Sequence, residues 1–260
     1  MMTTKIIILE KPKLRDPIFI EGLPGVGNVG RVAAGYLIEE LKAKKFAELI
    51  SSHFMPIVIV PQGSTVEMVK IEFFYWKNKK GKNDLIIMIG DSQSIDPEGH
   101  YEIVGKIIKF LKKLKVKEIF ALAGLNIGIM TEKPKVVGAV NDPSLEQKYK
   151  KYNIIFDTSK RVGTIVGAAG LFLGIAKYYK IPAVCLMGET SGMPFLPDPK
   201  SAEVVLKVLT QILDIKIDTS KLEEEVKKMR ELMQKIEATQ AQMFQLPTQP
   251  KKEEGLTYIG

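Results

Sequence analysis

Strand-like and helix-like segments alternate along most of this chain, and that alternation is the feature that most limits the folds open to it. Short runs rich in β-branched and aromatic residues are typical of strands, whereas apolar residues three or four positions apart are typical of helices. The expected strands cover residues 5–9, 17–21, 54–60, 66–76, 85–90, 118–123, 136–140 and 183–187. The expected helices cover residues 29–41, a stretch that begins at 96–98, 143–152, a glycine-rich stretch that ends at 179, and 199–213.

This order predicts an α/β fold with helices on both faces of one sheet. The segments 54–60 and 66–76 are joined through Pro61-Gln62-Gly63, which is a turn signal, so we expect these two strands to be antiparallel and the sheet to be mixed. The domain is expected to span residues 1–218.

The turn between the second expected strand and the first expected helix carries a glycine pattern with two interpretations. Gly25, Gly27 and Gly30 satisfy G-x-G-x-x-G, a pattern that lets a backbone approach a pyrophosphate at a helix N-terminus. That interpretation requires an acidic residue about twenty positions further on, at the end of the next strand. Glu48 has roughly this spacing but precedes Leu49 and Ile50, the residues expected to form that strand. We therefore favour a structural turn with close helix–sheet packing, and we expect no cofactor.

A second group of glycines lies in the most apolar window of the chain. These residues recur at steps of four, three and four, which predicts a smooth strip along one helix face and tight helix packing; a phosphate-binding turn before Ile165 is the alternative. The group comprises Gly163, Gly167, Gly170 and Gly174.

The loop after the strand expected at 183–187 is the best candidate for a catalytic loop. Glu189, Thr190 and Ser191 follow that strand, and ligands of α/β sheets bind at the carboxyl ends of strands. The other interpretation is that these groups satisfy the loop backbone. Gly188 then serves as a structural loop position, and Asp198 begins the next helix.

The two histidines do not complete a catalytic site or a metal site. His53 and His100 cannot be placed beside Ser191 from the sequence, and no Cys or carboxylate stands at metal-ligand spacing from either histidine. We therefore expect no catalytic and no metal-ligating residues.

Composition excludes several partners. The net charge of +8 comes from lysines spread among many glutamates, which favours a solvated surface over a nucleic-acid interface. The most apolar window, residues 162–176, is shorter than the ~20 residues of a membrane span. The single Cys185 excludes an internal disulfide and suits a reducing cytoplasm.

Beyond residue 218 the composition changes to that of a long amphipathic helix, expected at 219–244. Apolar side chains at alternating steps of four and three predict a heptad seam. This seam packs either on its own domain or on a neighbouring subunit, and the sequence leaves both open. Its residues are Leu222, Val226, Met229, Met233 and Ile236. Residues 245–260 are expected to form a linker and an apolar tail.

Four blocks in order along the chain carry a resemblance to a known family. They read EGLPGVGNVG (21–30), AGLNIG (123–128), GAAGLFLG (167–174) and GETSGMPFLPDPKSA (188–202). Together they resemble the archaeal proteasome assembly chaperone family. The resemblance implies a three-layer α/β domain akin to phosphorylases and hydrolases, no catalysis, homo-oligomers, and binding to the proteasome core particle.

The C-terminus has a parallel of its own. Proteasome activators end in a hydrophobic residue, a tyrosine and any last residue, and the terminal carboxylate pairs with a lysine in a pocket between α-subunits. The end of this chain is similar to that motif, with Tyr258 third from the end instead of second. The resemblance implies contact with the α-subunits through Leu256, Tyr258, Ile259 and Gly260.

Two other classes of function stay open. The first is a nucleotide- or nucleoside-handling enzyme that uses the Gly25–Gly30 loop with Glu189 to Ser191. The second is a scaffold for a non-proteasomal protein, with the heptad seam as its interface.

Overall fold

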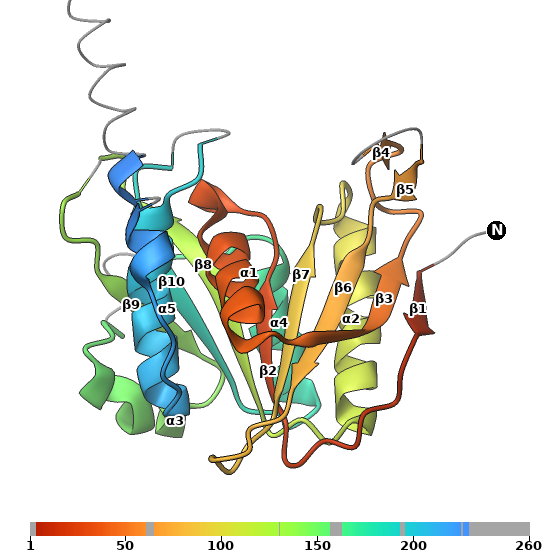
Figure 1. The fold of residues 1–260 in the computed structure, drawn as a ribbon, viewed down its shortest axis with the longest axis horizontal. Helices are drawn as coiled ribbons and strands as arrows, with labels where there is room; N and C mark the ends of the chain where they lie inside the picture. Colours follow the sequence, from red (N-terminus) through yellow and green to blue (C-terminus); the bar gives the residue numbers. More distant parts are fainter. Residues whose placement is uncertain are drawn as a thin grey trace, which may run out of the picture.

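The computed structural model describes residues 4–60, 65–129, 131–156, 163–192, 196–224 and 226–228. Its centre is a mixed sheet of eight strands in the order β1-β3-β6-β7-β2-β8-β10-β9 (Figure 1). In chain order the strands are β1 (Lys5–Ile8), β2 (Ile18–Gly22), β3 (Lys44–Ile50), β6 (Ile71–Trp76), β7 (Leu85–Gly90), β8 (Glu118–Asn126), β9 (Val136–Val140) and β10 (Ala183–Thr190). The helices are α1 (Val29–Leu41), α2 (Pro97–Lys113), α3 (Pro143–Tyr149), α4 (Ala168–Tyr178) and α5 (Pro199–Leu213), with 3-10 turns η1 (Val26–Asn28) and η2 (Lys150–Tyr152).

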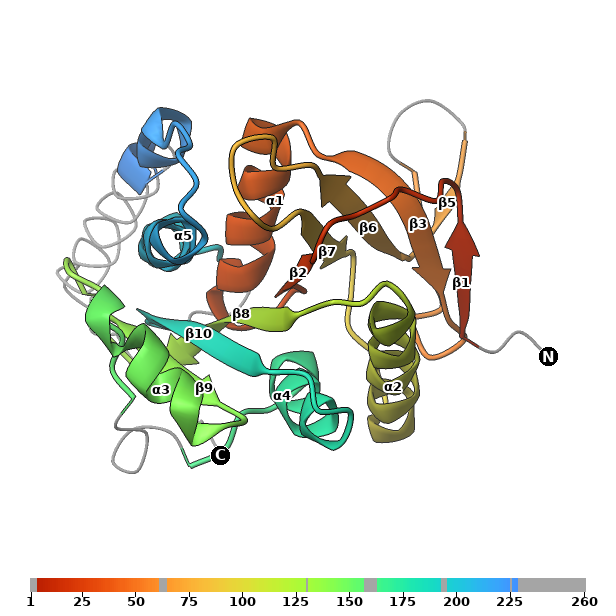
Figure 2. The same cartoon turned by 90° about the horizontal axis from the view of Figure 1, so that it is seen from below.

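Helices cover the sheet on both faces. Figure 2 shows α1 and α5 on one face and α2 and α4 on the other. Each face has its own buried cluster, with Leu37 and Leu206 in the first and Phe172 and Ile107 in the second. The predicted α/β fold with a mixed sheet and helices on both faces is therefore confirmed.

The middle of the sheet is parallel and buried. Strand β2 runs parallel to β7 and β8, and β8 runs parallel to β10. All six residues of β7 and all eight of β10 are buried. Continuous apolar runs of this kind are what strands with both faces covered require.

The flank formed by β1, β3 and β6 is antiparallel. Buried and half-buried residues alternate along β6, because one face of this strand meets the core and the other meets solvent. The solvent face carries a charged ladder in which Lys45 Nζ lies 2.7 Å from Glu48 Oε1 and 2.9 Å from Glu72 Oε1.

The structure corrects several expected boundaries. Residues 54–60 and 66–76 do not form one antiparallel pair: only β4 (Val58–Ile59) and β5 (Glu67–Met68) pair, as a separate two-stranded sheet, while β6 joins the main sheet. Strand β3 begins at Lys44, five residues before the expected Leu49 and Ile50; its start was missed because Lys44 and Lys45 are polar and exposed. Strands β8 and β10 continue three residues beyond the expected ends, so Gly188 to Thr190 belong to a strand.

The predicted strip of four glycines along one helix is wrong. Helix α4 begins at Ala168, so Gly163 and Gly167 precede it, and Gly167 is its N-cap with φ 85°. A Cβ on Gly170 would lie 2.3 Å from Ile165 O, but one on Gly174 would meet nothing within 4 Å. Close packing thus accounts for one of these positions and a left-handed backbone for another.

In the part of the chain that the structure describes, no helix has the length and apolar composition needed to cross a bilayer.

Candidate functional site

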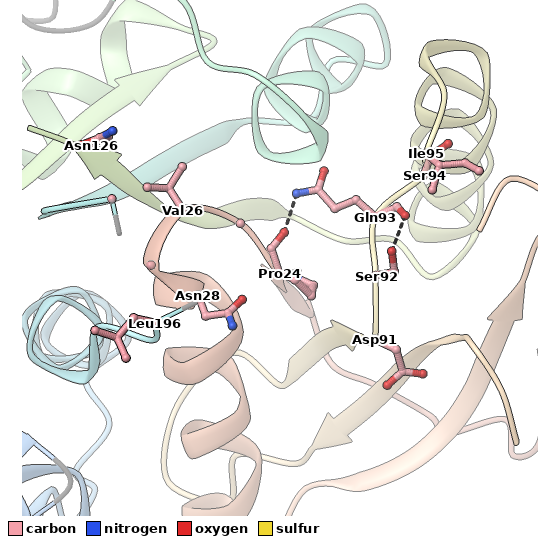
Figure 3. A pocket seen from close by; sticks show the side chains of 13 residues that line it. Pro24, Val26, Asn28, Asp91, Ser92, Gln93, Ser94, Ile95, Asn126 and Leu196 are labelled. Atoms are coloured by element: carbon pink, nitrogen blue, oxygen red, sulfur yellow. Dashed lines mark hydrogen bonds between the residues drawn. The ribbon is translucent and has the colours of Figure 1, made fainter. Parts of the chain in front are cut away.

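A cleft of about 520 Å³ opens at the carboxyl ends of β2 and β7. The loops after these adjacent parallel strands lead to helices on opposite faces, α1 and α2, which is the crevice where α/β sheets bind ligands. Figure 3 shows the two loops facing each other, with Gln93 reaching toward Pro24. The cleft is lined by Pro24, Gly25, Val26, Gly27, Asn28, Asp91, Ser92, Gln93, Ser94, Ile95, Asn126, Gly192 and Leu196.

The glycine loop itself is held by close packing. A Cβ on Gly30 would lie 2.1 Å from Leu122 O, and one on Gly27 would lie 2.8 Å from Thr190 Oγ1. Gly27 also has φ 60°, a left-handed conformation that favours glycine. Gly25 differs, since the nearest atom to its Cβ position is Gln93 Nε2 at 3.8 Å, on the other side of the cleft.

Two further segments singled out in the sequence meet this loop. The Asp198 N–H donates to Gly27 O at 2.8 Å, and the Asp198 side chain caps α5 by accepting from Ser201 N at 2.9 Å. A Cβ on Gly188 would lie 2.3 Å from Ser201 Oγ. The structure therefore brings the glycine loop, the end of β10 and the start of α5 together.

The polar groups proposed for catalysis are engaged with the backbone. Glu189 is buried, and its Oε2 accepts from Lys135 N at 3.0 Å. Thr190 is buried as well, and its Oγ1 accepts from Gly192 N at 3.4 Å. No described side-chain contact joins either histidine to Ser191. This arrangement fits the structural interpretation of the loop.

The nucleotide interpretation also lacks its ribose-binding acid. Glu48 lies in β3, which β6 and β7 separate from β2, and not in a parallel strand beside β2. Its carboxylate belongs to the ladder with Lys45, which lowers its pKa through a hydrogen bond. Glu48 cannot reach the glycine loop from this position.

A buried carboxyl group, that of Glu21, lies near the end of β2, shortly before Pro24 at the edge of the cleft. Strand β2 leaves β8 after the pair Glu21–Ala121 but stays paired to β7 for one more residue. Glu21 Oε1 accepts from Leu23 N at 2.9 Å. Burial raises the pKa of Glu21 to about 8, while backbone N–H groups of Leu23 and Leu122 act in the opposite direction. The carboxyl group thus serves the backbone where the strands diverge.

Sequence reasoning missed the role of Gln93. Its Nε2 donates to Pro24 O at 2.6 Å, and its Oε1 accepts from Ala168 N at 3.0 Å and lies 3.2 Å from His100 Nε2. One side chain therefore ties the loop after β2 to the starts of α2 and α4. No local sequence signal marks a glutamine for such a role.

The two histidines are far apart in the sequence, but both contact Asp96 at the start of α2, His53 from the segment after β3 and His100 from the helix itself. His53 Nδ1 lies 2.9 Å from Asp96 Oδ2, and its Nε2 lies 3.2 Å from Glu102 Oε2. The hydrogen bond with Asp96, assisted by the one with Glu102, raises the pKa of His53. The described residues contain no group of three metal-ligating side chains at a common point.

Most of the C-terminal residues singled out in the sequence lie outside the described residues. Residues 220–224 and 226–228 are helical, Leu222 is fully buried in the core beneath α1 and α5, and Val226 is half-buried. Where the rest of the seam packs therefore stays a prediction. Met229, Met233, Ile236, Leu256, Tyr258, Ile259 and Gly260 are outside the described residues, as are the expected limits at 244 and 245.

Known proteins resemble this chain over nearly all of its length. Residues 19–237 match the model of the PAC2 family. An uncharacterized protein of Methanocaldococcus jannaschii is 37% identical over 265 residues, with 100% of both chains covered. The crystal structure of Pyrococcus furiosus PbaB, described as an archaeal proteasome activator, is 42% identical with a TM-score of 0.86, and the match covers 91% of this chain and 100% of that one. Pyrococcus furiosus PbaA, described as an archaeal homolog of proteasome-assembly chaperone, is 26% identical with a TM-score of 0.75, over 93% and 94% of the two chains.

Proposed function

The chain belongs to the PAC2 family, and from this premise we propose that it is a non-enzymatic, oligomeric partner of the proteasome core particle that binds through its C-terminal residues. The observation that carries the proposal is the similarity to PbaB, an archaeal proteasome activator, over the whole of that chain. A cytoplasmic location follows from such a partner.

The chemistry of the cleft supports a non-enzymatic role. Among the described residues that line it, Asp91 is the one ionisable side chain, and no histidine, lysine or cysteine faces it. Acid–base catalysis needs a proton donor or acceptor within hydrogen-bond reach of a reacting group. Asp91 instead accepts from Lys70 N at 3.0 Å, so it serves the backbone of the neighbouring loop.

A short tail is a weak ligand that gains strength from repetition. One carboxylate–lysine contact contributes ~1.5–3 kcal/mol, and a short tail alone reaches a Kd of about 1 mM. An oligomer that presents several tails raises this affinity by ~10²-fold or more. Residues 245–260 reach about 50 Å when extended at ~3.3 Å per residue, so each tail is long enough to contact a partner well away from the folded domain.

Co-sedimentation with an archaeal core particle tests the tail. The full chain is expected to co-sediment, and a chain that ends at Gln245 is expected to lose the association because it lacks every apolar tail residue and moves the carboxylate. A Tyr258→Ala chain keeps the length and the carboxylate, so it isolates the aromatic contact and should bind at least tenfold more weakly.

Deletion of Gly260 provides a matched variant that is expected to strengthen the association instead of weakening it. It places Tyr258 second from the end, as in the activator motif, and should tighten the association if the motif register matters. Unchanged association in the chain that ends at Gln245 would show that the tail is not the contact.

A further inference from the structure

An apolar hairpin projects from the end of the sheet where the cleft opens. We define the apolar hairpin as residues 55–60 and 65–68, which contain β4 and β5. Both views place it at the same corner of the molecule as the edge strand β1 (Figures 1 and 2). Its large apolar side chains are between 36% and 63% exposed: Met55, Ile57, Val58, Ile59, Val60, Val66 and Met68.

The composition of this hairpin is unusual for a surface. Residues 54–66 contain no charged side chain, and Glu67 is the one charged residue of the hairpin as defined, although 26% of the whole chain is charged. A two-stranded sheet has little stability of its own, and a contiguous exposed apolar patch is typical of a protein–protein contact. Loss of charged residues marks the centre of such contacts. The hairpin therefore has the composition of a protein–protein interface, although no described part of its own chain covers these exposed side chains.

An apolar groove lies beside the hairpin. It encloses about 490 Å³ between the start of α2 and the segment before α4, helices that lie side by side on one face of the sheet (Figure 2). Ile95, Tyr101 and Val166 are 59%, 62% and 88% exposed there. We define the apolar groove by Ile95, Pro97, Tyr101, Ile165, Val166 and Leu171.

The hairpin and the groove adjoin. The Ile95 N–H donates to His53 O at 3.0 Å, and His53 Nδ1 lies 2.9 Å from Asp96 Oδ2, so residue 53 is attached to the wall of the groove. Met55, the first residue of the hairpin, follows two positions later. One continuous surface thus contains an apolar projection and an apolar hollow.

We propose that a second copy of this chain docks on this surface, with the hairpin of each copy entering the groove of the other. A twofold contact requires that the same patch be complementary to itself, and a projection next to a hollow of the same chemistry meets that requirement. The ten large apolar side chains of the hairpin and the groove are between 36% and 88% exposed, and together they supply area comparable with the ~800 Å² per partner of a stable interface. The inference rests on the proposed function, because pairing of two chains places two C-terminal tails on one particle.

The mass of the full chain, measured by light scattering after gel filtration, tests the pairing. Ile57→Glu with Val60→Glu places two charges on the hairpin, at positions that are 50% and 57% exposed and so tolerate a charge in the folded monomer. The mass is expected to fall at least twofold. Ile129→Glu with Tyr178→Glu is the matched control, because both residues are exposed outside the hairpin and the groove, and it should keep the mass. Unaltered circular dichroism shows that both variants fold.

Cross-linking tests which surfaces meet. Cys185 is fully buried, and burial raises the pKa of its thiol, so it does not compete. Chains with Val58→Cys and chains with Val166→Cys are co-expressed, and mild oxidation should join one to the other. A chain with Val166→Cys alone should not cross-link, because its groove thiol would face a hairpin without one.

Two results would overturn the proposal: an unchanged mass in the Ile57→Glu and Val60→Glu variant, or no Val58–Val166 cross-link between copies. An unchanged mass with loss of core-particle co-sedimentation would assign the surface to the core particle. A reduced mass together with core-particle binding by the chain that ends at Gln245 would instead sustain the pairing and reject the tail mechanism.

Discussion

The two halves of the sheet are built on different principles. In the covered half, β2, β7, β8 and β10 are parallel and lie between helices on both faces. The backbones of helix and strand approach closely there, as at Gly30 of α1 and Leu122 of β8. In the open flank, β1, β3 and β6 are antiparallel and turn one face to solvent, and the apolar hairpin extends beyond them. One half of the molecule is therefore specified by close packing, whereas the other leaves an apolar surface exposed.

The largest expected effect tests the packing of the covered half. Gly30→Ala should lower the free energy of unfolding by about 3 kcal/mol or more, because its Cβ would lie 2.1 Å from Leu122 O and the backbone must move. Gly105→Ala in α2 is the control, since nothing lies within 4 Å of its Cβ position. It should raise the free energy by about 1 kcal/mol through helix propensity. Urea unfolding of both variants measures the free energies. Equal free energies of unfolding would contradict the view that the covered half is specified by close packing.

A second prediction concerns the pH dependence of the same half. Between the ordinary pKa of a glutamate and the value of about 8 in the folded protein, Glu21 is protonated when folded and ionised when unfolded. The folded state therefore binds more protons, and stability falls as pH rises through this range. Glu21→Gln should remove a decline on the order of a few kcal/mol between about pH 5 and about pH 8.

Glu48→Gln, in the open flank, is the control for that measurement. The pKa of its carboxylate is lowered, so Glu48 is ionised in the folded and the unfolded protein over this pH range. The decline in stability seen in the wild type should therefore persist in Glu48→Gln. Parallel pH profiles of the wild type and Glu21→Gln would contradict the prediction.

The smallest effect is expected on the solvent face of the flank. Lys45→Met removes the 2.7 Å and 2.9 Å contacts with Glu48 and Glu72. The side chain is 36% exposed, so the free energy of unfolding should fall by less than about 1 kcal/mol. The loss should shrink further in ~0.5 M salt, where charges on the surface are screened. A loss as large as that of Gly30→Ala would show that the flank is packed as firmly as the covered half.

The same division explains what could be predicted from the sequence. Continuous apolar runs such as Leu85–Gly90 identify covered strands on their own. Strand β3 has a polar face, and β4 and β5 are two residues each, so local patterns located their edges poorly. The candidate site depends on contacts between residues far apart in the sequence. Gly27 contacts Thr190 and Gln93 contacts Ala168, and no local pattern relates these segments.

The contact between Gly27 and Asp198 also sets the order in which the protein can be completed. The partners of Gly27, Thr190 and Asp198, lie more than 160 positions later along the chain. At about 5–20 residues per second, a ribosome needs roughly 8–30 seconds to supply them. Strand β2 gains its neighbours β7 and β8 earlier, once residues 90 and 126 have been made, but the loop at Gly27 keeps one side open until Thr190 and Asp198 arrive. A loop near the start of the chain is therefore among the last parts of the fold to be enclosed.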